Sequence, residues 1–152
     1  MIFNENGIIL NDNKNYESFK KIYDSLSKEE KESYGYDVGI DDNTIYTKQI
    51  GDAYIILDDY TKKTNKWHPY KGLYISIAAA PSARGTGVTD KLISCAKNDN
   101  PNYDLIAIIR DDNTHSINLF TRNGFKLACK IKTLINSHTY KTFNYYIYKR
   151  SN

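Results

Sequence analysis

Apolar and polar positions follow patterns along this chain that predict a mixed series of helices and strands. Over residues 15–33, Phe19, Ile22 and Leu26 recur at helical spacing and share one face. Short apolar or alternating segments bounded by Gly, Pro, Asn or Asp predict strands instead. The predicted strands cover residues 44–50, 53–60, 72–80, 105–109, 125–135 and 142–149.

The connections and the chain's first residues complete this pattern. Residues 1–10 predict a short strand or hairpin, and Ser27 offers an N-cap for a second short helix. Two further helices are expected over residues 88–97 and 113–122, the latter ended by Gly124. This order predicts a mixed α/β fold with a central strand–helix–strand crossover.

Size and composition place all 152 residues in one folded unit. With 40% hydrophobic and 26% charged residues and no linker or repeat, the chain is not disordered, and we expect a single domain over residues 1–152. No stretch approaches the roughly 20 apolar residues of a membrane span. The net charge of +3 gives no support for a nucleic-acid partner. Two cysteines and the lack of a signal-peptide pattern favour the cytoplasm, and no His, Cys or carboxylate spacing predicts a metal site.

The most informative segment is residues 81–89, which reads Pro-Ser-Ala-Arg-Gly-Thr-Gly-Val-Thr between a predicted buried strand and a predicted helix. Glycines bring backbone N–H groups close to a ligand, and a helix N-terminus adds unpaired donors and partial positive charge. Together they predict a phosphate site, to which Arg84 adds a full charge. The P-loop pattern is excluded because no Lys follows Gly87, and the dinucleotide pattern fails because Asp90 replaces its third glycine.

A second motif lies about 25 residues further along. Residues 113–125 read Asn-Thr-His-Ser-Ile-Asn-Leu-Phe-Thr-Arg-Asn-Gly-Phe. Residues 79–87 match the pattern V-x-P-x-x-R-G-x-G with Ala79 for Val, and residues 113–125 match N-x-x-[AS]-x-x-L-Y-x-x-x-G-F with Phe120 for Tyr. Over residues 70–150 the chain therefore resembles the GNAT superfamily of acyl-CoA-dependent N-acetyltransferases, with Thr89 where the family has a small Gly or Ala.

The resemblance implies a mostly antiparallel central sheet with one splayed parallel strand pair and flanking helices. It implies acetyl-CoA, or another acyl-CoA, as cosubstrate, with pantetheine in the gap between strands 72–80 and 105–110. The residues it implies for binding CoA are Ile77, Ala78, Ala79, Arg84, Gly85, Thr86, Gly87, Val88, Thr89, Asn113, Ser116 and Phe120.

The implied reaction is direct attack of a neutral primary amine on the thioester. Phe120 stands where many family members have a tyrosine that protonates the leaving thiolate, so another donor is expected, or none. Ser116, His115 and Tyr74 are the candidates for this acid. Asp58, Asp59 and His68 are the candidates for a base, since a free lysine-like amine is protonated at neutral pH. Ser116, Tyr74 and Asp58 are our catalytic candidates.

Structural alternatives accompany each of these residues. Arg84 can be an ordinary surface arginine that binds no ligand. Asn113 can serve only as a helix N-cap, and Phe120 can be a core residue. Tyr146 or Tyr148 of the last strand can be core or line the acceptor cleft.

Two other functions also remain open. One is a catalytically silent relative that binds CoA or a partner, and the other is a transferase with a different activated donor. The acceptor can be a small molecule, a peptide or a protein amine, and the protein a monomer or homodimer.

Overall fold

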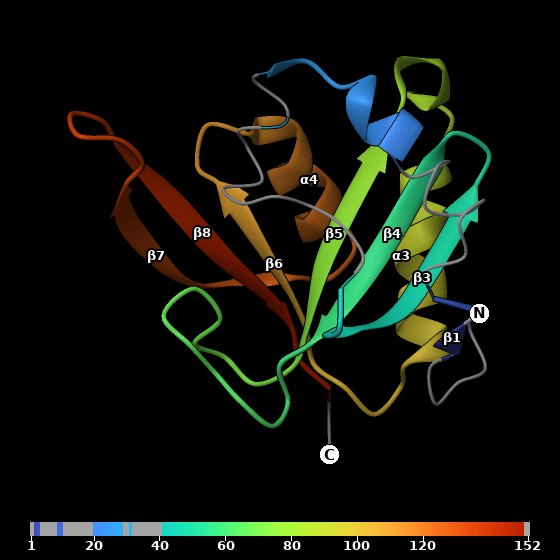
Figure 1. Cartoon of the computed structure of the whole chain (residues 1–152), viewed down its shortest axis with the longest axis horizontal. Coiled ribbons are helices and arrows are strands. Elements are labelled where there is room, and N and C mark those ends of the chain that lie inside the picture. The colour runs from blue at the N-terminus through green and yellow to red at the C-terminus, as the bar shows by residue number, and fades with distance from the viewer. Residues whose placement is uncertain (1, 4–8, 11–19, 29–30, 32–40, 151–152) are drawn as a thin grey trace.

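The computed structural model describes residues 2–3, 9–10, 20–28, 31 and 41–150 (Figure 1). Its strands are β1 (Ile2–Phe3), β2 (Ile9–Leu10), β3 (Thr44–Ile50), β4 (Ala53–Asp59), β5 (Leu73–Ala79), β6 (Leu105–Arg110), β7 (Lys126–Leu134) and β8 (Tyr140–Tyr148). Its named helical elements are the 3₁₀ turn η1 (Pro81–Ala83), α3 (Val88–Asp99) and α4 (Thr114–Arg122). The strand and helix predictions over residues 44–149 are confirmed, with boundaries that differ by at most two residues.

The main sheet has six strands in the order β3-β4-β5-β6-β8-β7. All neighbours are antiparallel except β5 and β6, which α3 connects as a crossover. The prediction of a mostly antiparallel sheet with one parallel pair and flanking helices is therefore confirmed.

The parallel pair is closed at one end and open at the other. Only two residue pairs join β5 to β6, Leu73 with Leu105 and Tyr74 with Ile106. At the closed end, a Cβ on Gly72 would lie 2.7 Å from the carbonyl oxygen of Asp104, so only glycine permits this approach. Beyond these pairs the two strands diverge, as Figure 1 shows, and the predicted splay is present.

Helices cover both faces of the sheet. Successive strand residues point to opposite faces, so the strands present apolar side chains to the helices on each side. On one face, α3 and α4 bury Leu92, Ile93 and Phe120 against Ile55 and Ile75. On the other, residues 20–28 contribute Ile22 and Leu26, which pack on Tyr54, Ile56 and Ala78. The divergent part of β5 and β6 thus lies between two helical layers.

The first part of the chain agrees with its predictions wherever it is described. β1 and β2 pair antiparallel, which confirms the hairpin within residues 1–10. Residues 20–24 are helical, and the N–H of Lys31 donates to the carbonyl of Ser27 at 3.0 Å, as expected for a second helix. The rest of the predicted 15–33 helical region lies outside the described residues. Within the described part, no helix combines the length and apolar character needed to cross a bilayer.

Candidate functional site

A cleft of about 650 Å³ opens where β5 and β6 diverge. Its walls come from the end of β5, the loop that leads into α3, the middle of β6, and one face of α4. Ten of the twelve residues predicted to bind CoA line it: Ile77, Ala78, Ala79, Arg84, Gly85, Gly87, Thr89, Asn113, Ser116 and Phe120. The other two, Thr86 and Val88, belong to the same loop, but their atoms are not part of the lining. The structure thus gathers the two sequence motifs into one cleft, and the role of each residue stays a prediction.

The loop at one end of the cleft has the backbone of an anion site. Gly85 and Gly87 adopt left-handed φ values of 76° and 77°, which other residues rarely take. A Cβ at either glycine would meet nothing within 4 Å, so open space adjoins the backbone on that side. Gly87 is the N-cap of α3 and caps it with no side-chain hydrogen bond, and the first-turn amides have no intrahelical partner. The cleft therefore ends in exposed donors and the positive end of a 12-residue helix.

The loop also contains a 3₁₀ turn, η1, that the sequence did not predict. Pro81 occupies the beginning of the turn, where its fixed φ and missing N–H are tolerated. Arg84 follows, and its guanidinium donates to the carbonyl of Ala79 at 3.4 Å. This contact folds the arginine back over the end of β5, on the cleft side.

On the opposite wall, α4 presents Asn113, Ser116 and Phe120. The Oδ1 of Asn113 accepts from the N–H of Ser116 at 3.2 Å, so Asn113 is the N-cap of α4 as well as a cleft residue. Phe120 is 3% exposed and packs edge-on against Phe125, with ring centroids 5.0 Å apart. The exposed His115 also lines the cleft.

The other two catalytic candidates lie away from Ser116, on the opposite face of the sheet. Asp58 and Tyr74 are direct cross-strand neighbours at the closed end of β5. The hydroxyl of Thr44 donates to Asp58 at 2.7 Å, and burial raises the pKa of Asp58 to about 7. The hydroxyl of Tyr74 donates to the carbonyl of Tyr70 and accepts from its N–H, both at 2.9 Å.

His68 joins this second group through its ring. It stacks on Tyr60 with centroids 3.8 Å apart and meets Tyr74 edge-on at 4.6 Å. Burial lowers the pKa of His68, which favours its neutral form. Asp59 instead accepts from the N–H and hydroxyl of Thr61 and caps a turn. The structure therefore brings Asp58, His68 and Tyr74 together, and separates them from Ser116.

Sequence reasoning missed an ion pair on the cleft wall. The Arg122 Nε and Nη2 donate to the two carboxylate oxygens of Asp90 at 3.0 and 2.9 Å, and the Asn123 amide donates to Asp90 at 2.9 Å. The hydrogen bond from Arg122 is the main cause that lowers the pKa of Asp90 to about 2. The partners are 32 residues apart, so no local pattern predicts the pair.

Several remaining expectations concern residues outside the cleft. Tyr146 is part of the core, and Tyr148 packs on Phe125, so neither lines the described cleft. Cys95 and Cys129 are free thiols, and both are half-buried. Among the described residues, no three His, Cys, Asp or Glu side chains are arranged to hold a metal ion.

Comparison with known proteins yields structural matches alone. No family model matches the chain, and no curated protein matches it. A protein provisionally assigned as a phosphinothricin N-acetyltransferase aligns with TM-score 0.63 and 21% identity over 95% of this chain and 98% of its own. The protein yncA from Salmonella typhimurium, provisionally assigned as an acetyltransferase and solved with acetyl-CoA, aligns with TM-score 0.54 and 17% identity over 66% of this chain and 58% of its own.

A third structure carries the superfamily's name. The GNAT superfamily phosphinothricin acetyltransferase from Sinorhizobium meliloti, in complex with acetyl-CoA, aligns with TM-score 0.50 and 21% identity over 63% of this chain and 52% of its own. The chain thus spans little more than half the length of two of these proteins and nearly all of the other. At these identities the comparison establishes architecture, and the chain has the fold of the GNAT acetyltransferases.

Proposed function

We propose that this protein is an acyl-CoA-dependent N-acetyltransferase that transfers an acetyl group to a primary amine, with residues 1–152 acting as one catalytic domain. The observation that carries the proposal is the coincidence of both sequence motifs with one cleft between the splayed strands. Structural neighbours described as acetyltransferases, two of them solved with acetyl-CoA, support the same conclusion.

Residues of the cleft fit a molecule of acyl-CoA. The open backbone at Gly85 and Gly87, with the first-turn amides of α3, would hold the pyrophosphate, and Arg84 would add a full positive charge. The backbone of Ile77 and Ala79 lies beyond the last pairs between β5 and β6 and would hold the pantetheine arm, with Asn113 on the other wall. Acyl-CoA would supply an activated thioester carbonyl at the middle of this gap.

Asp58 is the group best suited to accept the amine's proton. It is a partly buried carboxylate that accepts a hydrogen bond from Thr44, and its pKa of about 7 matches a base that works near neutral pH. The amine nitrogen forms the new bond to the carbonyl carbon, its proton passes to Asp58 directly or through water, and the carbon–sulfur bond breaks. His68 and Tyr74 would line the acceptor's approach.

Among the described residues that line the cleft there is no tyrosine whose hydroxyl would meet the leaving thiolate. Phe120 occupies that position, and a CoA thiolate, with a pKa near that of free cysteine, is a good enough leaving group to depart without full protonation. Of our three catalytic candidates, Ser116 is the one that lines the cleft, and its hydroxyl would donate to the thiolate. Tyr74 is less suited, because Tyr70 already engages its hydroxyl.

Phe120 also favours a second candidate function, a CoA-binding protein without turnover. Both functions share the cleft, and they differ in whether any amine is acetylated. The same experiments address which amine is the acceptor, a small molecule, a peptide or a protein, and whether another acyl-CoA is the donor.

The test is thermal unfolding with and without excess acetyl-CoA. At a ligand concentration about a hundredfold above its dissociation constant, binding should add ~2.7 kcal/mol, a rise in Tm of about 5–10 °C. Arg84→Glu should abolish this rise, whereas Lys48→Glu, an exposed charge reversal on β3 away from the cleft, should retain it. Release of free thiol with a panel of amines then separates the enzyme from the silent binder. A wild-type protein whose Tm does not respond to acetyl-CoA would overturn the proposal.

A further inference from the structure

Arg122 is a second arginine, besides Arg84, in the lining of the cleft. It ends α4, and its side chain lines the cleft while remaining 52% exposed. Two of its five N–H donors engage Asp90, at 3.0 and 2.9 Å. The other three are not used by this pair, so Arg122 can bind an anion while it stays attached to α3.

Asp90 makes the position of Arg122 more specific. It is the third residue of α3, in the turn whose amides form the anion end of the cleft. An uncompensated carboxylate there would repel a phosphate. The two-point bond from Arg122 offsets its charge, and the amide of Asn123 donates a further hydrogen bond. The same bond fixes the planar guanidinium in one orientation, and less side-chain freedom is lost when a further anion binds.

CoA has more phosphate than the loop can account for. It carries a pyrophosphate and, on the adjacent ribose, a separate 3′-phosphate. The loop offers the open backbone at Gly85 and Gly87 and the first-turn amides of α3, which suit the pyrophosphate. Arg122 lies on the α4 wall of the cleft and bonds to Asp90 in the first turn of α3, so it lies at the same end of the cleft as this loop.

We propose that Arg122 binds the ribose 3′-phosphate of CoA, and thereby lets the protein distinguish CoA from its 3′-dephospho form. This inference rests on the proposed function, because it assigns one further phosphate of the same cosubstrate. Asp90 acts as a positioning residue that holds the guanidinium.

The test compares the affinities of CoA and 3′-dephospho-CoA by calorimetric titration. We expect Arg122→Gln to weaken CoA binding about tenfold or more, the value of a lost charge-assisted hydrogen bond, and to weaken dephospho-CoA much less. Arg84→Gln is the matched comparison, because it should weaken both ligands by a similar factor.

A double variant separates direct contact from charge neutralisation. Arg122→Gln leaves the carboxylate of Asp90 uncompensated, which would weaken any anion, so the substitution is repeated together with Asp90→Asn. The quantity to compare is the ratio of CoA affinity to dephospho-CoA affinity. If Arg122 binds the 3′-phosphate, this ratio is about tenfold lower in the double variant than in Asp90→Asn alone.

Three results would overturn the inference, and only one of them would also overturn the proposed function. An unchanged preference in Arg122→Gln shows that Arg122 does not read the 3′-phosphate. A double variant that regains the preference of Asp90→Asn alone shows that Arg122 only neutralises Asp90. If the wild-type protein binds neither ligand, the proposed function itself fails, whereas in the first two cases it stands.

Discussion

Asp58 is the residue whose environment departs most from that of an ordinary surface carboxylate. It is partly buried beside Tyr74 on the sheet face opposite α3 and α4, and it accepts a hydrogen bond from Thr44. Burial raises its pKa from 3.8 to about 7. Between these values the folded protein holds a proton that the unfolded chain has released, so the free energy of unfolding falls as pH rises from about 4 to 7.

Asp58→Asn should remove this pH-dependent loss of stability, because the amide oxygen still accepts the hydrogen bond from Thr44 and carries no charge. At pH 8 we expect the variant to be more stable than the wild type by about 1–2 kcal/mol, less than the full shift implies because the side chain is partly exposed. At pH 4 the two proteins should be equally stable. Urea unfolding at both pH values measures the difference, and a variant that is less stable at pH 8 would contradict the burial argument.

The same substitution tests Asp58 as the base. In the wild type, kcat/KM for an amine should rise with pH through about 7, as the carboxylate forms. Asp58→Asn should lower kcat by roughly a hundredfold or more and remove this step from the profile. A variant that keeps both the rate and the step shows that the proton leaves by another route.

Phe120 tests the departure of the thiolate. Phe120→Tyr should change kcat by less than about threefold, since a thiolate with a pKa near 8.5 needs little help to leave. Phe120→Leu is the control for packing, because it loses the edge-on contact with Phe125 and should cost about 1–2 kcal/mol in stability. A tenfold rise in kcat for Phe120→Tyr, or activity gained by an inactive wild type, would show that the missing hydroxyl limits the reaction.

At the scale of elements, the loop into α3 can be tested with a matched pair of glycines. Gly87 and Gly51 have φ values of 77° and 56°, and a Cβ at either would meet nothing within 4 Å. Gly87→Ala and Gly51→Ala should therefore each cost a similar ~1 kcal/mol of backbone strain. Only Gly87→Ala should also weaken acetyl-CoA, because its methyl group enters the open space beside the loop. Equal affinities in the two variants would place the phosphate elsewhere.

The elements themselves were predictable because their signals are local. Gly51 makes the turn between β3 and β4, and Asn113 and Gly124 flank α4 where capping residues are expected. The loop glycines and Arg84 were recognised because they lie between a predicted buried strand and a predicted helix. By contrast, η1 was missed, because a proline that begins a 3₁₀ turn looks in sequence like an ordinary loop residue.

Contacts between distant segments were not predictable in this way. The stack of Tyr60 on His68 depends on how the loop after β4 folds back over β5, and the pairing of Arg122 with Asp90 depends on the approach of α4 to α3. Neither leaves a periodicity or a spacing in the sequence. The second group of candidate residues, Asp58, His68 and Tyr74, was therefore foreseen as separate candidates but not as one cluster.

At the scale of the whole molecule, the parallel pair divides the sheet into two halves that meet only at the closed end. Gly72 and the pairs Leu73–Leu105 and Tyr74–Ile106 fix this junction. The cleft is the consequence of the divergence beyond it. A ligand in the cleft would contact the walls beyond this junction, so its effect should be local and should not spread over the sheet.

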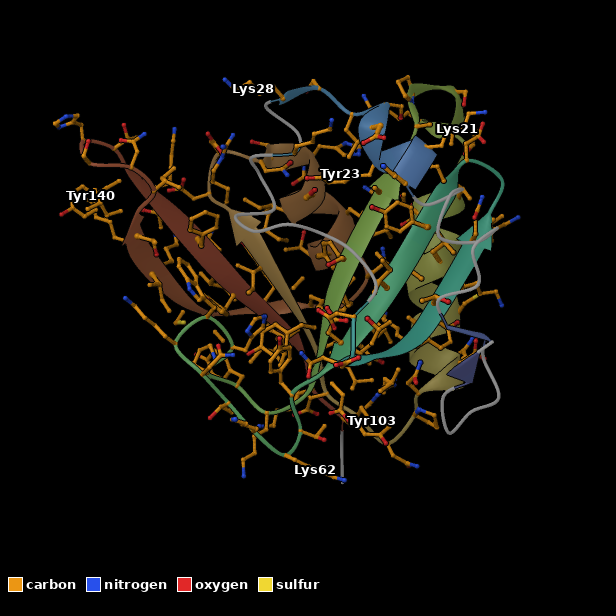
Figure 2. All side chains as sticks on the ribbon, viewed as in Figure 1. Lys21, Tyr23, Lys28, Lys62, Tyr103 and Tyr140 are labelled. Carbon is orange, nitrogen blue, oxygen red and sulfur yellow. The ribbon has the colours of Figure 1, made fainter. Side chains whose placement is uncertain are left out.

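Hydrogen exchange at short labelling times tests this division, because only local openings contribute there. Acetyl-CoA should slow exchange in residues 75–79 and 84–90, which border the cleft, since the bound molecule covers these amides. The β7–β8 hairpin is the internal control: its tip, marked by the exposed Tyr140, lies away from β5 (Figure 2), and its exchange should not change. Arg84→Glu should remove the protection at both cleft segments. Protection of the hairpin equal to that of the cleft would show that the two halves respond together, and the expectation of a local effect would be wrong.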